Sequence, residues 1–96
     1  MIKTEKILDA QPYFLVCQFN NGEIKKLNVE AIFKDNVNSI SANKILKEDF
    51  FVTAKIGEMG QILWDNAAEM KDENGNLFLC EYDISAEYAY YNSNII

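Results

Sequence analysis

Apolar side chains fill most positions of residues 13–19, where aromatic, branched aliphatic and cysteine residues leave only one polar position. Aromatic and β-branched residues at this density are typical of a strand that is buried on most of both faces. A shorter run at residues 7–10 predicts an earlier strand, with Pro12 in the bend between the two. Asn21-Gly22 then predicts a hairpin, because both central positions of a type I′ turn need positive φ. The chain therefore opens with three antiparallel strands.

A two-residue loop at Asn21-Gly22 also predicts a register for this hairpin. It pairs Phe19 with Ile24 and Val16 with Leu27, which puts apolar residues opposite one another on each face. We expect these pairs to hold the two strands together.

Shorter signals predict the elements that follow. Asn28 and either Ser39 or Ser41 are the expected caps of two short helices, the second near residues 42–48. Further strands are expected at 51–56, 61–65 and 76–82, with a hairpin turn at Asn74-Gly75 before the last of them. A final helix is expected from Ala86 to about Tyr91, after the cap Ser85, and we expect it to dock through Tyr88 and Tyr91. Hairpins and helices segregated in this way predict one α+β domain over residues 1–96. We expect a small, mainly antiparallel twisted sheet of about five or six strands in β-β-β-α-α-β-β-β order, with short helices packed on it.

Charge narrows the range of functions. The chain has 15 acidic and 9 basic residues, a net charge of −6, and neither histidine nor arginine. Residues 1–48 carry a net charge of +1 and residues 49–96 a net charge of −7. Nucleic-acid backbones bind basic surfaces, so direct binding of nucleic acid is not expected. Without histidine the chain also lacks Ser-His and Cys-His nucleophiles and the usual zinc ligands.

The run Asp72–Asn76 has side-chain oxygens at alternate positions, as the first half of an EF-hand calcium loop does. Leu77 and Asp83 stand where that loop needs a glycine and a bidentate glutamate, so a plain hairpin turn is the expected structure. The sequence has no glycine-rich phosphate loop either. We therefore expect no catalytic residues, no metal and no cofactor, and a protein that is not an enzyme.

Cys17 and Cys80 lie in separate apolar runs, and we expect both to be buried free thiols. So few cysteines in so small a domain favour a reducing compartment. The sequence predicts no signal peptide and no transmembrane segment. The expected location is the cytoplasm, without membrane contact.

The acidic second half is the main functional signal. An acidic face steers a basic partner towards itself, and tyrosine and tryptophan are common anchors in protein interfaces. The residues expected to contact a partner are Trp64, Asp65, Glu69, Asp72, Glu73, Tyr90 and Tyr91, with further acidic residues at Glu81, Asp83 and Glu87. The leading hypothesis is a non-enzymatic protein-interaction module whose partner is a small basic protein.

Three alternatives stay open. The acidic residues can be a solvated surface that only keeps the chain soluble. A carboxylate pair in a pocket near Trp64 would make a small-molecule site or a weak hydrolase. An exposed strand edge at residues 61–65 or 77–82 would make a structural homodimer by pairing across a two-fold axis.

The run from Ile7 to Glu23, closing on Leu27-Asn28-Val29, resembles the opening of the small bacterial family called Domain of Unknown Function 2442. That opening is a strand, an Asn-Gly or Asp-Gly turn, a second strand and a short helix. The segments Ile62-Leu63-Trp64 and 83–90 are also similar to the family. The chain departs from the family by the added stretch 66–82, and it has Ala86 and Ala89 where relatives usually have proline and leucine.

This resemblance implies a compact α+β domain with a twisted antiparallel sheet. It also implies a setting, because some relatives are joined to a helix-turn-helix domain or encoded beside another small protein in toxin–antitoxin-type pairs. The chain would then be the antitoxin-like, acidic half of a two-protein regulatory pair. The resemblance supplies no catalytic or ligand residues.

Overall fold

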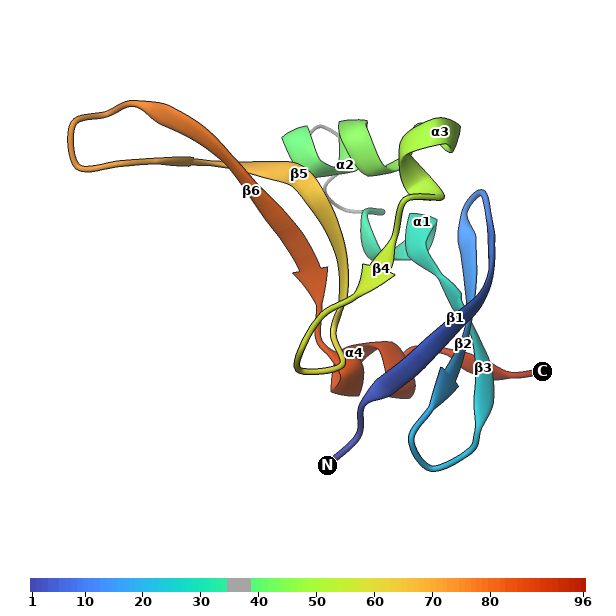
Figure 1. The fold of residues 1–96 in the computed structure, drawn as a ribbon. Coiled ribbons are helices and arrows are strands. Elements are labelled where there is room, and N and C mark those ends of the chain that lie inside the picture. The colour runs from blue at the N-terminus through green and yellow to red at the C-terminus, as the bar shows by residue number, and fades with distance from the viewer. Residues whose placement is uncertain (35–38) are drawn as a thin grey trace.

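The computed structural model describes residues 1–34 and 39–96, and this part of the chain forms two antiparallel sheets with four short helices (Figure 1). Along the chain the elements are β1 (Thr4–Gln11), β2 (Phe14–Phe19), β3 (Ile24–Asn28), α1 (Val29–Ile32), α2 (Ile40–Ile45), α3 (Glu48–Phe51), β4 (Lys55–Ile56), β5 (Ile62–Lys71), β6 (Leu77–Ile84), α4 (Ala86–Tyr91) and β7 (Asn94–Ile95). The strand order is β1-β2-β3-β7 in the first sheet and β4-β5-β6 in the second. The predicted α+β class and antiparallel pairing are confirmed. The single sheet of five or six strands is wrong, because seven strands divide between two sheets.

The β2–β3 turn is one residue longer than the sequence predicts. Phe19 N–H donates to the Glu23 carbonyl, and Gly22 N–H donates to the Phe19 carbonyl, both at 2.9 Å. Gly22 has a φ of +87°, so it is the left-handed residue of a three-residue loop. The predicted pair Phe19–Ile24 is therefore wrong, although Asn-Gly correctly predicts the hairpin.

The longer loop shifts the whole register of β2 against β3 by one residue. Leu27 lies opposite Leu15, and both side chains are buried, whereas the sequence predicts Val16 opposite Leu27. Because side chains alternate between faces, this shift keeps both leucines on the core side of the first sheet.

The predicted helix caps are present, but the region after them differs from the prediction. The Asn28 side chain accepts from Ala31 N–H at the start of α1, and Ser39 accepts from Ala42 N–H at the start of α2. The predicted strand at 51–56 is wrong, because Glu48–Phe51 form the helix α3 and only Lys55–Ile56 are extended.

Trp64 lies at the centre of the core that joins the two sheets. Its side chain is fully buried, and its indole N–H donates to the Phe51 carbonyl at 2.9 Å. The Phe51 ring lies 6.1 Å from Trp64 and 5.4 Å from Tyr13, measured between ring centroids. Burial of Phe51 in this cluster explains why the segment is helical there despite its strand-like alternation. The cluster also contains Leu15, Cys17, Phe19 and Leu27 from the first sheet and Ile62 and Ile84 from the second.

Helix α4 docks through small residues rather than through the tyrosines that the sequence predicts. Ala86 and Ala89 are buried, whereas Tyr88 and Tyr91 are exposed. Tyr90 is half-buried, and its ring packs edge-on against Phe19 at 5.2 Å. The alanines let the helix backbone approach the core closely, which leaves no room for a tyrosine on that side.

Both ends of the chain are attached to the β2–β3 hairpin. The Asn20 amide donates to the Met1 carbonyl at 2.8 Å, and β7 pairs with β3 through Lys25–Ile95. Figure 1 shows both termini on the opposite side of the molecule from the β5–β6 turn.

Replacing Trp64 by alanine is expected to lower the free energy of unfolding by about 3–5 kcal/mol, because truncating a buried aromatic side chain leaves a cavity. The change also removes the donor to the Phe51 carbonyl. Urea unfolding followed by far-UV circular dichroism measures the loss. Tyr91→Ala is the control, since that side chain is exposed and the expected change is within about 0.5 kcal/mol. Equal stabilities of the two variants would contradict the central place of Trp64.

Candidate interaction site: the projecting hairpin

The outer half of the β5–β6 hairpin projects from the body of the molecule (Figure 1). We call residues 68–80 the arm. The molecule measures 45 Å along its longest axis but only 25 and 22 Å along the others, and the arm forms one end of the long axis. Two strands and their turn have no core of their own, so the arm depends on the body for its position.

The arm begins where the ladder between β5 and β6 is irregular. The pairing shifts register between Trp64 and Ala68, and Asn66 has a φ of +57°. Asparagine tolerates this left-handed conformation better than most residues. The side chain of Lys44 on α2 donates to the Asn66 carbonyl at 2.9 Å, and Ala67 is fully buried. The body thus holds β5 firmly at the point where the arm leaves it.

Each face of the arm has its own character. Met70 lies opposite Phe78 and Ala68 lies opposite Cys80, which makes one face wholly apolar. This face continues the core-facing side of the hairpin, because Tyr82 and Trp64 are the next pair along it towards the body. On the other face leucines alternate with charged residues, through the pairs Glu69–Leu79 and Lys71–Leu77.

Large apolar side chains are unusually exposed on the arm. The exposed fractions are 56% for Met70, 63% for Leu77, 46% for Phe78 and 50% for Leu79. Single exposed apolar residues are ordinary, but here two lie on each face of one projecting element, a concentration of the kind that marks an interaction site.

The turn of the arm is ordered by one carboxylate. The Asp72 carboxylate accepts from the backbone N–H groups of Asn74 and Asn76, both at 2.9 Å. Gly75 has a φ of +81° and donates to the Asp72 carbonyl at 3.1 Å. The predicted hairpin turn is therefore confirmed, and Asp72 builds the turn instead of pointing towards a partner.

The residues that the sequence predicts as one interaction surface lie in three separate places. Glu69, Asp72 and Glu73 are exposed on the arm. Tyr90 and Tyr91 are on α4, which Figure 1 shows at the far side of the molecule from the arm tip.

The third place is the inner part of β5. Asp65 is exposed there and forms an ion pair with Lys55 at 2.5 Å. Both side chains face water, so this pair adds little to stability. Trp64 beside it offers no surface to a partner, because it is fully buried in the core.

The apolar residues of the arm, Met70, Leu77, Phe78 and Leu79, are absent from the residues predicted to contact a basic partner, although the homodimer alternative names the strand edge 77–82. Their signal is the run Leu77-Phe78-Leu79 directly after an Asn-Gly turn. In the sequence that run is indistinguishable from an ordinary buried strand, because the alternation of a strand does not say whether anything covers it.

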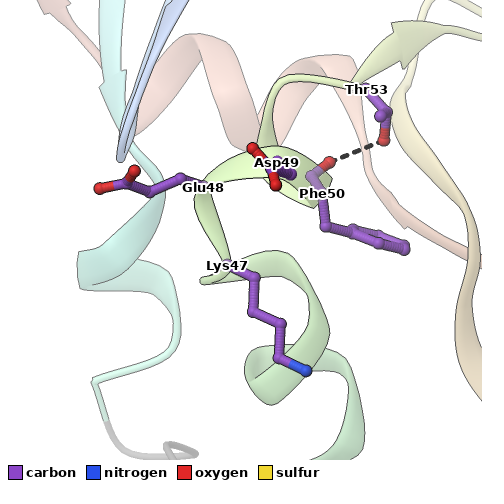
Figure 2. Close-up of a pocket in the computed structure, with 5 residues that line it drawn as sticks. All are labelled: Lys47, Glu48, Asp49, Phe50 and Thr53. Carbon is purple, nitrogen blue, oxygen red and sulfur yellow. Dashed lines mark hydrogen bonds between the residues drawn. The ribbon is translucent and has the colours of Figure 1, made fainter.

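A surface hollow of about 590 Å³ lies at the short helix α3. It is lined by Lys47, Glu48, Asp49, Phe50 and Thr53 (Figure 2). Figure 2 shows the charged side chains pointing in different directions, and Thr53 Oγ1 donates to the Phe50 carbonyl at 2.7 Å. Groups that diverge in this way give no common point for a ligand.

Acidic residues are also dispersed. Every carboxylate in residues 1–34 and 39–96 is exposed except that of Glu23, which is half-buried. Over the same residues no three histidine, cysteine or acidic side chains are grouped so that they could hold a metal ion. A carboxylate pair near Trp64 therefore lacks the desolvated acid that hydrolysis requires. Over that part of the chain, no helix has the length and apolar character needed to cross a membrane.

The two cysteines differ, although the sequence predicts that both are buried. Cys17 is buried in the core, and burial raises the pKa of its thiol to about 12. Cys80 lies on the apolar face of the arm and is only half-buried.

We expect a thiol-specific reagent to modify Cys80 quickly in the folded protein and Cys17 only after unfolding. Only the thiolate reacts, and the buried Cys17 thiol stays protonated at mildly alkaline pH. Mass spectrometry of the labelled protein locates the modification, and Cys80→Ser removes the fast phase. Equal labelling rates for both thiols would show that the arm face is covered.

Asp72 gives the arm a pH dependence. The backbone N–H of Asn76 is the main cause that holds the pKa of the Asp72 carboxyl below its ordinary value. A carboxylate with a lowered folded-state pKa stabilises the folded turn above its unfolded pKa, and this contribution is lost as the pH falls through the folded-state pKa. An NMR titration should therefore show the Asn74 and Asn76 amide resonances shifting with one step in that acidic range. The Asp72→Asn variant should show no such step, and a wild-type titration without it would contradict the assigned turn.

No family model, curated protein or solved structure matches the chain. The resemblance to Domain of Unknown Function 2442 therefore stays a prediction. The exposed arm is the feature of the molecule that bears most directly on its function.

Proposed function

We propose that this protein is a non-enzymatic interaction module that binds a basic partner protein through the arm. The observation that carries the proposal is the apolar face formed by Ala68, Met70, Phe78 and Cys80, which extends the core side of the hairpin into solvent. Burial of apolar surface is the main favourable term in protein association. A partner that covers this face gains the favourable free energy of burying apolar surface without any rearrangement of the body.

Charge supports a basic partner. Residues 62–84, which make up the hairpin, contain six acidic residues and one lysine, a net charge of −5. Most of the acidic side chains lie beside the apolar face and not on it, since Glu69 and Glu81 point to the other side of the sheet. This arrangement of an apolar centre with charged surroundings is common in transient interfaces, where the charges raise the association rate.

The rest of the described surface supports binding rather than catalysis. The acidic residues are dispersed and solvated, and the side chains that line the hollow at α3 diverge. Under the family resemblance, the partner is the other half of a two-protein regulatory pair. The cytoplasm is the proposed location, and the free thiols Cys17 and Cys80 agree with a reducing compartment.

The proposal is tested with a tagged chain and a lysate of the source organism, at low and at moderate salt. We expect wild type to retain one small basic protein in stoichiometric amount, released as salt rises, because salt screens attraction between exposed charges. The double variant Met70→Ser with Phe78→Ser should lose that protein, since it removes the largest apolar side chains of the arm face.

Tyr91→Ser is the matched control, because Tyr91 is also an exposed apolar residue but lies on α4. It should retain the partner as wild type does. Far-UV circular dichroism establishes that both variants are folded. Undiminished recovery by the folded Met70/Phe78 variant would remove the arm from the interface and overturn the proposal.

A further inference from the structure

Most strand edges of this protein are guarded against pairing with another strand. β4 and β7 are two residues long, and β1 has two register irregularities along its pairing with β2. The part of β5 beyond β4 carries the irregularity at Asn66, whose carbonyl already accepts from Lys44. Short strands, bulges and charged side chains are the devices by which native proteins protect open edges.

The outer edge of β6 has none of these devices over residues 77–80, and its only charged residues are Glu81 and Asp83. Residues Leu77–Ile84 lie at the end of the strand order β4-β5-β6, and no strand in the described part of the chain pairs with their outer side. The eight residues include no proline, glycine or lysine. A long edge of this kind is a template for an added strand.

The hairpin turn fixes which backbone groups of β6 point outward. Asp72 N–H donates to the Asn76 carbonyl at 3.0 Å, which makes these two residues a hydrogen-bonded pair. Bonded and non-bonded pairs alternate along an antiparallel ladder, so Met70 and Phe78 form the next bonded pair. The residues whose N–H and C=O groups point away from β5 are therefore Leu77, Leu79, Glu81 and Asp83.

These outward residues define what an added strand must carry. A residue paired with each of them has its side chain on the same face as theirs. Glu81 and Asp83 are exposed and two positions apart, so they select basic side chains at two alternate positions of the added strand. Its other positions lie beside Leu77 and Leu79 or beside the apolar face of Phe78, and they select apolar side chains.

We propose that the basic partner binds by adding one strand to the outer edge of β6, with alternate basic residues opposite Glu81 and Asp83. This inference rests on the proposed function and specifies its geometry. A second copy of the chain fits this edge less well. Antiparallel pairing of two β6 strands would bring Glu81 and Asp83 of both copies onto one face, and like charges at neighbouring positions oppose pairing.

The probe is a synthetic capped peptide of alternating lysine and valine residues, titrated into the ¹⁵N-labelled full chain. The control peptide has the same composition arranged as Lys-Lys-Val-Val repeats, so it keeps the charge and places no two lysines two positions apart. We expect the alternating peptide to bind at least about tenfold more tightly, because only it places lysines opposite both acidic residues. On binding, the amides of Leu77, Leu79, Glu81 and Asp83 should become protected from hydrogen exchange, while those of Phe78, Cys80 and Tyr82 are protected already.

Two pairs of variants test the backbone and the charges separately. Leu79→Pro removes one outward N–H and leaves the ladder to β5 intact, so it should weaken binding about tenfold relative to Leu79→Ala, which keeps that N–H. Glu81→Gln with Asp83→Asn should weaken binding about threefold to tenfold, and Glu5→Gln, on β1 of the first sheet, should leave it unchanged.

The outcomes separate the two proposals. If both peptides shift arm resonances equally and the four outward amides stay unprotected, strand addition is wrong while the arm remains the binding site. If neither peptide affects the arm and the free chain is a dimer with those amides already protected, a second copy occupies the edge. That result would overturn both the strand-addition inference and the proposed basic partner.

Discussion

The hydrogen bond from the Trp64 indole to the Phe51 carbonyl is the contact on which the rest of the structure depends. It joins a strand of the second sheet to the helix α3, whose Phe51 ring also contacts Tyr13 between the first two strands. The bond satisfies the only polar atom of a side chain that is otherwise surrounded by apolar groups. With the hairpin fixed at Trp64, the body determines where its outer half points.

The hairpin is therefore one element with two environments. Its inner half is part of the core, and its outer half carries the same alternation of side chains with its large apolar residues exposed. The irregularity at Asn66, held by Lys44, separates the two halves. A register irregularity inside a strand bends the strand and increases its local twist. Here it anchors β5 against α2 and lets the two strands continue past the body with their apolar face still paired across the ladder.

Local signals in the sequence predict much of this structure. Both Asn-Gly pairs lie in hairpin turns, and Asn28, Ser39 and Ser85 cap helices as expected, because turns and caps depend on residues close together in the chain. Tertiary contacts decide the features that were predicted wrongly. Phe51 alternates like a strand residue but is helical because its ring is buried against Trp64, and the alanines of α4 dock where tyrosines were expected.

The candidate site likewise has features that the sequence predicts and features that only the structure shows. Composition predicts an acidic second half, and the hairpin does carry most of that charge. Sequence pattern does not show that Leu77-Phe78-Leu79 is uncovered, since a covered and an uncovered strand have the same alternation. The sequence-based prediction also places Trp64 and Tyr91 on one surface, although Trp64 is buried and Tyr91 lies on a distant helix.

Attachment of both termini to the β2–β3 hairpin has a consequence for how this chain can be built into larger proteins. Met1 and Ile95 are each bonded to that hairpin, at the side of the molecule away from the arm. A domain fused at either end would therefore extend from the rear of the module and leave the β6 edge accessible. A linker that joined residues 1 and 96 in a circular permutant would likewise run on the side away from the arm.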